Sequence, residues 1–108
     1  MTFYSTHPFY GSHWVAVCID PRGCGYCFDS YGLPPVYKKF ENFLNRNCAW
    51  WNFNRATLQA PFSTVCDQYC VYFLLCMRRG EPMRAIVSRF SRAVVENDRA
   101  VAQFVYFR

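Results

Sequence analysis

Charged side chains are scarce in this chain, since only 18% of its 108 residues are Asp, Glu, Lys or Arg. Glycine occurs five times and histidine twice, and no repeat, low-complexity tract or Pro/Ser-rich linker is present. This composition excludes a disordered tail, a flexible linker and a collagen-like rod. No apolar run reaches about 18 residues, so no transmembrane helix is predicted. The first ten residues lack a basic stretch followed by an apolar one, so no secretory signal is predicted.

Apolar and aromatic residues are abundant instead, at 53% and 20% of the chain. The length suits one domain, which we expect to span residues 1–108. A domain of this size buries only about two-thirds of its extended surface. We therefore expect some of the aromatic side chains to form an exposed contact surface, or to be covered by a partner or a further segment.

The seven cysteines are an odd count. With no export signal, we expect a reducing intracellular compartment, no secretion, and thiols that are free or catalytic rather than paired. The formal charge of +5 comes mainly from residues 76–108, which hold seven Arg and three acids. These arginines suit nucleic-acid phosphates, although a solvated helix face explains them more simply. The residues concerned are Arg78, Arg79, Arg84, Arg89 and Arg92.

The first half of the chain has the pattern of a hairpin followed by a helix and a strand. Residues 14–19 are apolar throughout and predict an interior strand. Residues 20–23 are typical of a turn, and residues 25–29 of the returning strand. Helical spacing over residues 36–45 predicts an amphipathic helix, and residues 49–53 predict a short strand.

The second half is predicted to be helical. Apolar residues occur nearly all round a helix over residues 64–79, which indicates a central buried helix. Thr64 resembles the first residue of a capping box, and Gly80 suits the C-terminal end. Further helices are predicted over residues 82–90 and 93–107, and the whole order indicates an α+β domain.

Two residues of the hairpin are candidates for a catalytic pair. If the hairpin turns near Pro21, residues whose numbers sum to about 42 lie opposite each other, which brings His13 and Asp29 to the same end. A carboxylate beside an imidazole fixes its tautomer and stabilises its charged form. Taken alone, each residue also has an ordinary structural explanation, as a strand-start histidine and a turn aspartate.

Cys66 and Gln59 are the other two candidates. Cys66 is placed in the first turn of the buried helix, where unpaired N–H groups and the helix dipole favour a thiolate. An imidazolium nearby would lower the pKa of the thiol further. Gln59 precedes this helix, where its amide and the Cys66 N–H can donate to the oxygen of a tetrahedral intermediate. A lone cysteine is more often simply buried, so the prediction rests on all four residues together.

Five segments carry a family resemblance over roughly residues 8 to 85. They are Gly11-Ser-His-Trp-Val-Ala-Val17, Cys27-Phe-Asp-Ser-Tyr-Gly32, Leu58-Gln-Ala-Pro-Phe-Ser-Thr-Val-Cys66, Tyr69-Cys70 and Phe73-Leu74. The chain resembles the adenovirus-type cysteine endopeptidases (adenain), which share a broad group with the ubiquitin-like-protein-specific proteases and with enzymes of Maverick/Polinton transposons. That group has the order His, Asp or Glu, Gln, Cys, whereas papain has its Cys first.

The resemblance implies a papain-like-related cysteine protease fold, with a small antiparallel sheet packed on a central buried helix that carries the nucleophile. It implies a thiol endopeptidase with Cys66 as nucleophile, His13 as general base and acid, Asp29 as its orienting partner and Gln59 as oxyanion donor. Trp14 would pack beside the site and contact substrate. The substrate would be a protein or peptide, and no metal or other cofactor is implied for the chemistry.

Further expectations follow from the adenovirus branch. Cys48 falls where those enzymes carry a cysteine that pairs with an activating peptide, although a free core thiol is equally consistent with the sequence. DNA is a cofactor of those enzymes, which implies nucleic-acid binding through the C-terminal arginines. The resemblance also implies a location in the nucleus or the virion.

The sequence departs from the family at three points, and the first two favour an alternative function. Asp67 stands where the family usually has Gly, and a carboxylate there opposes thiolate formation unless it points away. Only twelve residues precede His13, which predicts a domain without its N-terminal segment. The interval from Asp29 to Gln59 is also short. The alternative is a catalytically inactive or fragmentary relic of the fold that acts as a binding module.

A zinc module is a third hypothesis. Cys24 and Cys27 have the spacing of one zinc-ligand pair. Cys66 and Cys70 do not make a convincing second pair, because they lie four apart on a helix predicted to be buried. The sequence therefore favours a thiol protease over a zinc module.

Overall fold

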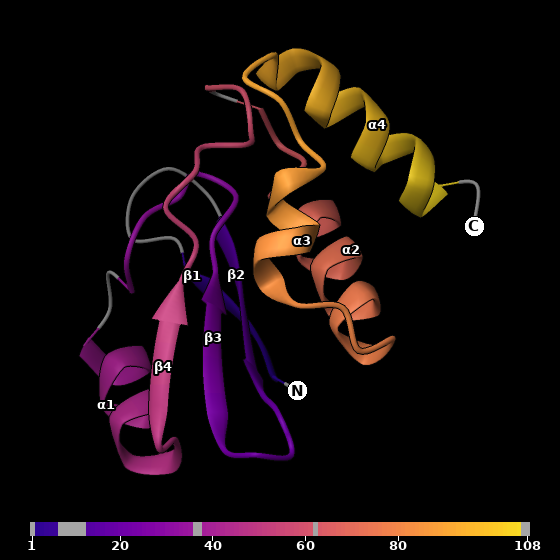
Figure 1. The fold of residues 1–108 in the computed structure, drawn as a ribbon. Helices are drawn as coiled ribbons and strands as arrows, with labels where there is room; N and C mark the ends of the chain where they lie inside the picture. Colours follow the sequence, from indigo (N-terminus) through magenta and orange to yellow (C-terminus); the bar gives the residue numbers. More distant parts are fainter. Residues whose placement is uncertain (1, 7–12, 36–37, 62, 107–108) are drawn as a thin grey trace.

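The computed structural model describes residues 2–6, 13–35, 38–61 and 63–106, with side chains not described for residues 2–6, 13 and 106. These residues form one sheet and a set of helices, which confirms the predicted α+β class (Figure 1). The elements are β1 (Thr2–Thr6), β2 (His13–Ile19), β3 (Cys24–Phe28), α1 (Lys38–Asn47), β4 (Trp50–Phe53), α2 (Cys66–Arg78), α3 (Met83–Ser88) and α4 (Val94–Tyr106).

The sheet has the strand order β1-β2-β3-β4. The first two strand pairs are antiparallel, but β3 and β4 are parallel. The prediction of an antiparallel sheet was therefore wrong for the last pair, because α1 carries the chain back across the sheet, so that β4 runs in the same direction as β3. Strand β1, which no sequence pattern had predicted, pairs with β2 at the opposite edge.

The predicted hairpin is confirmed, but its register differs. The Gly23 N–H donates to the Asp20 carbonyl oxygen at 3.0 Å, and Gly23 has a φ of +84° that favours glycine. Residues Pro21 to Gly23 form a three-residue connection, so paired residues have numbers that sum to 44, as in Ala16 opposite Phe28. The register of about 42 was wrong, because the turn is centred one residue later than Pro21.

The sheet is covered on both faces. Side chains of β2 alternate, so Val15 and Val17 pack with Leu44 of α1 while Ala16 joins the core that contains Phe73 of α2. Figure 1 shows α1 on one side of the sheet and α2 and α3 on the other. This burial explains why β2 is apolar from Trp14 to Ile19.

Helix α2 is the central buried helix that the sequence predicted. Its Phe73 ring stacks on Phe28 of the sheet, with ring centroids 4.5 Å apart. Thr64 is not the N-cap, since that position is Val65, which makes no side-chain cap. The hydroxyl that faces this end is that of Ser63, which accepts a hydrogen bond from the Val65 N–H at 3.4 Å. Gly80 follows the helix with a φ of +87°, as predicted.

Exposed apolar side chains occur at scattered points of the described surface. Trp50 is 52% exposed at the edge strand β4 and meets Tyr26 edge-on, with ring centroids 5.9 Å apart. Within the described part of the chain, the helices are all too short or too polar to cross a membrane.

Candidate active site

Cys66 is the first residue of α2, and its sulfur lies against the beginning of β2. The backbone N–H of Trp14 donates to the Cys66 Sγ at 3.4 Å. One helical turn later, the Cys70 thiol donates to the Trp14 carbonyl oxygen at 3.3 Å. Both peptide groups of Trp14 are thus bound by thiols of α2, which fixes the start of the helix on the sheet. Cys66 itself is 7% exposed.

His13 directly precedes Trp14 and begins β2. Because bond lengths and angles keep the His13 Cα about 2.4 Å from the Trp14 nitrogen, the Cys66 sulfur lies within about 6 Å of that Cα. The His13 side chain lies outside the described residues. The predicted contacts of its imidazole with Cys66 and Asp29 therefore stay predictions.

Asp29 follows β3 directly and is buried, with 3% of its surface exposed. Its Oδ1 accepts a hydrogen bond from the Tyr31 N–H at 2.8 Å. The Asn54 side chain binds both backbone groups of Asp29. The Asn54 Oδ1 accepts from the Asp29 N–H at 2.9 Å, and the Asn54 Nδ2 donates to the Asp29 carbonyl oxygen at 2.8 Å. Sequence reasoning did not single out Asn54, although a polar residue directly after the β4 strand was the available signal.

Tyr31 connects this aspartate with the loop that precedes Cys66. Its hydroxyl lies 3.5 Å from the Ser63 carbonyl oxygen, on the loop that leads into α2. Burial raises the pKa of Tyr31, and negative charge on Cys66 and Asp29 raises it further. Tyr31 therefore joins the residue that follows β3 to the loop that leads into α2.

Gln59 is fully buried beside the same loop, and its side-chain amide is engaged at both ends. Ser30 donates its hydroxyl proton to the Gln59 Oε1. The Gln59 Nε2 donates to the carbonyl oxygen of Ser63 at 3.0 Å and to its hydroxyl at 2.9 Å. Gln59 thus ties the end of β3 to the start of α2, with its donors directed at Ser63.

The two residues next to His13 and Cys66 have clear positions. Trp14 is half-buried and packs against the core cluster on the α2 face of the sheet. Asp67 is exposed, and its Oδ1 accepts a hydrogen bond from the Gln68 N–H at 2.9 Å. The carboxylate at position 67 therefore bonds to the backbone of its own helix.

No disulfide joins the seven cysteines, all of which lie in the described part of the chain. Burial raises the pKa of Cys27 to about 12, and it also raises the pKa of Cys70. These two thiols keep their protons at neutral pH. Cys48 is half-buried, and burial raises its pKa as well. Its predicted pairing with an activating peptide stays a prediction. Within the described ranges, His, Cys, Asp and Glu residues form no cluster of three that could hold a metal ion.

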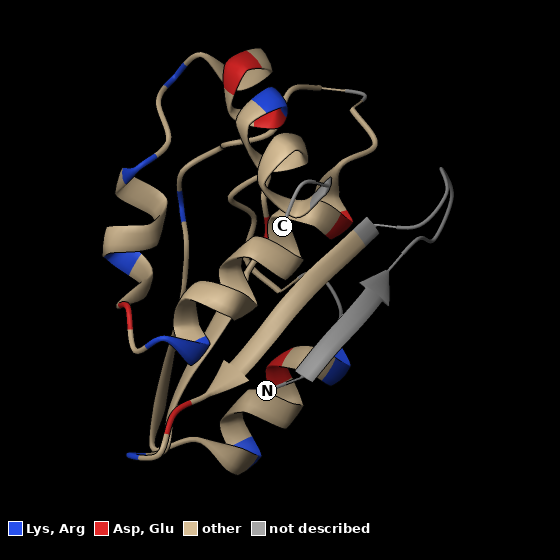
Figure 2. Ribbon diagram, turned by 90° about the vertical axis from the view of Figure 1, so that its right-hand side faces the viewer, with Lys and Arg blue, Asp and Glu red and all other residues tan. Residues whose placement is uncertain are grey.

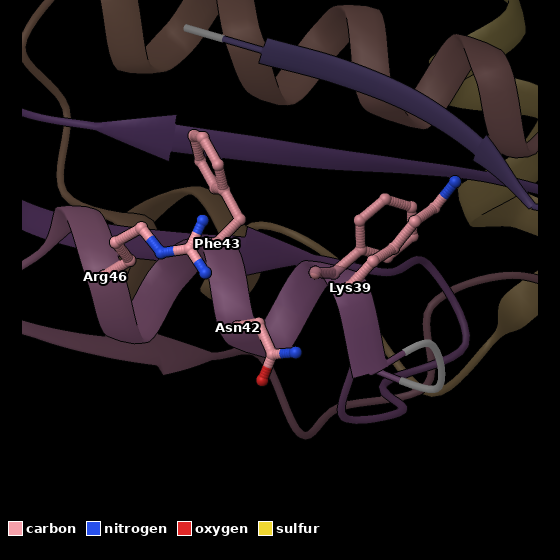
Figure 3. Close-up of a pocket in the computed structure, with 5 residues that line it drawn as sticks. Lys39, Asn42, Phe43 and Arg46 are labelled. Carbon is pink, nitrogen blue, oxygen red and sulfur yellow. The ribbon is translucent and has the colours of Figure 1, made fainter.

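A hollow of about 380 Å³ lies on α1, on the opposite side of the sheet from Cys66. Figure 3 shows Lys39 and Arg46 at its two ends, with Asn42 and Phe43 between them on the same helix. Its lining residues all belong to α1, so it is separate from the candidate active site.

The C-terminal basic residues are spread over several elements. Figure 2 shows the blue segments of Lys and Arg interspersed with red acidic ones. Arg89 forms an ion pair with Glu81 and donates to the Tyr72 hydroxyl at 3.0 Å, so one of the five arginines is held within the fold. Nucleic-acid binding stays a prediction.

The chain is similar to a viral protein, "Putative thiol protease R355" of Acanthamoeba polyphaga mimivirus, with 35% identity over 88 residues. The match covers 72% of this chain and 29% of the mimivirus protein, so the chain spans less than a third of that relative's length. No family model and no solved structure matches the chain. The similarity is to a protein named as a thiol protease, and the adenovirus and Maverick/Polinton branches stay predictions.

Proposed function

We propose that this chain is the catalytic part of a thiol endopeptidase that cleaves protein or peptide substrates. Cys66 is the nucleophile, His13 the general base and acid, Asp29 the residue that orients the imidazole, and Gln59 the donor to the oxyanion. Trp14 packs beside the site and lines the path of the substrate. The similarity to the mimivirus protein supports the class of activity.

The observation that carries this proposal is the 3.4 Å contact between the Cys66 sulfur and the Trp14 N–H. It holds the thiol at the N-terminal end of α2, beside the strand that begins with His13. Two effects stabilise a thiolate there. The helix dipole is positive at this end, and a backbone N–H already donates to the sulfur.

The proposed roles give the following reaction. His13 takes the proton of the Cys66 thiol, and the sulfur attacks the carbonyl carbon of the scissile peptide bond. The C–N bond then breaks as His13 gives the proton to the leaving amine, which leaves a thioester on Cys66. Water adds to the thioester, the carboxylic acid is released, and the proton returns through His13 to the sulfur.

Gln59 has to change partners to donate to the oxyanion. Both of its Nε2 contacts are with Ser63, three residues before the nucleophile. Binding of a substrate carbonyl would replace one of these contacts, and the other would keep the amide in place. Catalytic hydrogen bonds are often assembled only in the complex with substrate.

The test is covalent labelling by short peptides that end in a vinyl sulfone, followed by mass-spectrometric mapping of the modified residue. We expect one molecule of probe per chain, attached at Cys66, and no labelling of Cys66→Ala. Cys48→Ser is the matched control, because it removes a thiol that is more exposed than Cys66 but lies outside the proposed site. It should be labelled as fast as the unmodified chain.

Two results would contradict the proposal. Labelling at Cys48 rather than Cys66 would show that exposure alone decides reactivity. Complete absence of labelling in a folded protein would favour the second candidate function, a catalytically inactive binding module. The engagement of both Gln59 donors by Ser63 is the observation in favour of that candidate.

A further inference from the structure

Helix α4 binds the backbone on both sides of Gln59. We call residues 58–60 the Gln59 segment. The helix, Val94–Tyr106, lies beyond the residues that carry the family resemblance. In Figure 1 the loop between β4 and α2 rises to the end of the molecule where α4 begins. The contacts there come from two neighbouring residues of the first turns of α4.

Asn97 holds the peptide group that precedes Gln59. Its side chain is buried, with 5% of the residue exposed. Its Nδ2 donates to the Leu58 carbonyl oxygen at 3.0 Å and to the Ser91 carbonyl oxygen at 2.7 Å, and its Oδ1 accepts from the Ser91 N–H at 3.0 Å. Asn97 is thus fixed on its own side of the contact and cannot rotate away without losing three hydrogen bonds.

Asp98 holds the peptide group that follows Gln59. Its carboxylate accepts a hydrogen bond from the Ala60 N–H at 3.3 Å. The Tyr69 hydroxyl lies 2.7 Å from the Asp98 Oδ1 and 3.0 Å from the Leu58 carbonyl oxygen. Burial and this carboxylate raise the pKa of Tyr69, so its phenol keeps the proton that it donates.

The opposite side of the segment is bound by Ser30. Its carbonyl oxygen accepts from the Leu58 N–H at 2.8 Å and from the Gln59 N–H at 3.1 Å. The peptide groups around Gln59 are therefore held between the end of β3 and the beginning of α4. Since the direction of a side chain follows from the backbone that carries it, both sides set where the Gln59 amide lies.

We propose that Asn97 and Asp98 are positioning residues for Gln59, an inference that rests on the proposed role of Gln59 as oxyanion donor. They do not touch the reacting atoms. They hold the Gln59 segment so that the Gln59 amide stays at the start of α2. A displacement of a catalytic group by about 1 Å is enough to lower the rate of the catalysed reaction about a hundredfold.

The test separates the reactivity of the thiol from stabilisation of the oxyanion. Iodoacetamide alkylates Cys66 by direct displacement and forms no oxyanion. A peptide aldehyde adds reversibly to the sulfur, and its carbonyl oxygen then occupies the position of the oxyanion. We measure the iodoacetamide rate at Cys66, and the aldehyde affinity from its protection of Cys66 against that reagent. Asp98→Ala should weaken the aldehyde about tenfold and leave the iodoacetamide rate unchanged.

Glu96→Ala is the matched control, because it removes a carboxylate from the same helix at an exposed position. It should leave both measurements unchanged. Asp98→Asn keeps an oxygen that can accept from Tyr69, so it should restore most of the aldehyde affinity if Asp98→Ala fails to fold. The pair Gln59→Ala and Gln59→Ala/Asp98→Ala should bind the aldehyde equally, because Asp98 acts through Gln59.

The positioning proposal is wrong if Asp98→Ala binds the aldehyde as tightly as the unmodified chain does. It is also wrong if Asp98→Ala weakens the aldehyde further when Gln59 is already Ala, or if the iodoacetamide rate falls to the same extent. An unmodified chain that reacts with iodoacetamide but shows no aldehyde binding would instead overturn the proposed function, and the positioning role with it.

Discussion

Ser30 is bound to Gln59 through both its backbone and its side chain. Its carbonyl accepts from the Gln59 N–H, and its hydroxyl donates to the Gln59 Oε1. Both residues have no exposed surface, so neither group can turn to water instead. A buried amide oxygen without a donor is costly, which makes this serine a structural requirement of the site as well as a neighbour of Asp29.

We therefore expect Ser30→Ala to lower the free energy of unfolding by about 1–3 kcal/mol, the cost of leaving a buried acceptor unsatisfied. The measurement is urea-induced unfolding followed by circular dichroism. Ser88→Ala is the control, since its hydroxyl donates to the Ala85 carbonyl at an exposed position and should contribute less than about 0.5 kcal/mol. Equal losses in the two variants would contradict a role for burial.

Among the elements, β3 lies in especially close contact with α1 and β4. Gly25 is the second residue of this short strand. A Cβ at that position would overlap the Cys48 Sγ, and it would lie 3.0 Å from the Trp51 Cβ and 3.1 Å from the Leu44 Cδ2. Glycine is thus required here by the close approach of α1 and β4, and Cys48 fills the space beside it.

This packing predicts that Gly25→Ala destabilises the protein by about 1–3 kcal/mol, as overpacking of a core does. Adding Cys48→Ala removes the sulfur that the new methyl group meets, so the double variant should regain part of the loss. Thermal unfolding of the two single variants and the double variant measures this coupling. Strict additivity of the two losses would show that Cys48 and position 25 do not share the space.

Other properties of the elements were accessible from local sequence. Apolar periodicity located the buried helix α2 within two residues at either end, and Gly80 marked its termination. The N-cap was misplaced, because Thr64 has the right chemistry for a cap but Ser63 has the hydroxyl that reaches the helix start. Capping depends on the path of the loop, which Gln59 and Ser63 set together through their hydrogen bonds.

The whole molecule is a sheet with a core on each face, and buried thiols occur in both cores. Cys27 lies on the α1 face with no exposed surface, and Cys70 lies on the α2 face. Burial disfavours the thiolate, so the folded state binds their protons more tightly than the unfolded chain does. Stability of the entire domain is thereby linked to pH in the alkaline range.

For Cys27 the pKa rises from 9.0 to about 12 on folding. Because the folded pKa is the higher one, its contribution to stability is complete below pH 9 and is lost as the pH rises from 9 to about 12. The free energy of unfolding should fall by up to about 1.4 kcal/mol per pH unit for this group. Urea unfolding at pH 8 and pH 10 should show a smaller pH-dependent loss for Cys27→Ala than for the unmodified chain.

The control for that experiment is Cys48→Ala, which removes a half-buried thiol and should change the pH dependence less. For each variant, only the change in the free energy of unfolding between pH 8 and pH 10 is compared, because Cys27→Ala also leaves a cavity that lowers stability at every pH. An identical pH-dependent loss in Cys27→Ala and the unmodified chain would contradict the raised pKa.

The sequence by itself determined the order of the elements from β2 onward, the α+β class and the identity of the central helix. It did so because apolar periodicity and turn residues act over a few neighbouring positions. It also singled out Asp29, Gln59 and Cys66, and hydrogen bonds of Gln59 join the end of β3 to the loop that enters α2. The chemical roles of these three residues and of His13 stay predictions for experiment.

Only the tertiary structure decided the parallel pairing of β4, the hairpin register and the contact of Cys66 with Trp14. It also decided that α4 binds the Gln59 segment. Apart from the hairpin, these contacts join residues from 26 to 52 positions apart, and they depend on how the covered faces of the sheet accommodate each helix. No local pattern carries that information, because it arises when the packed elements share one core.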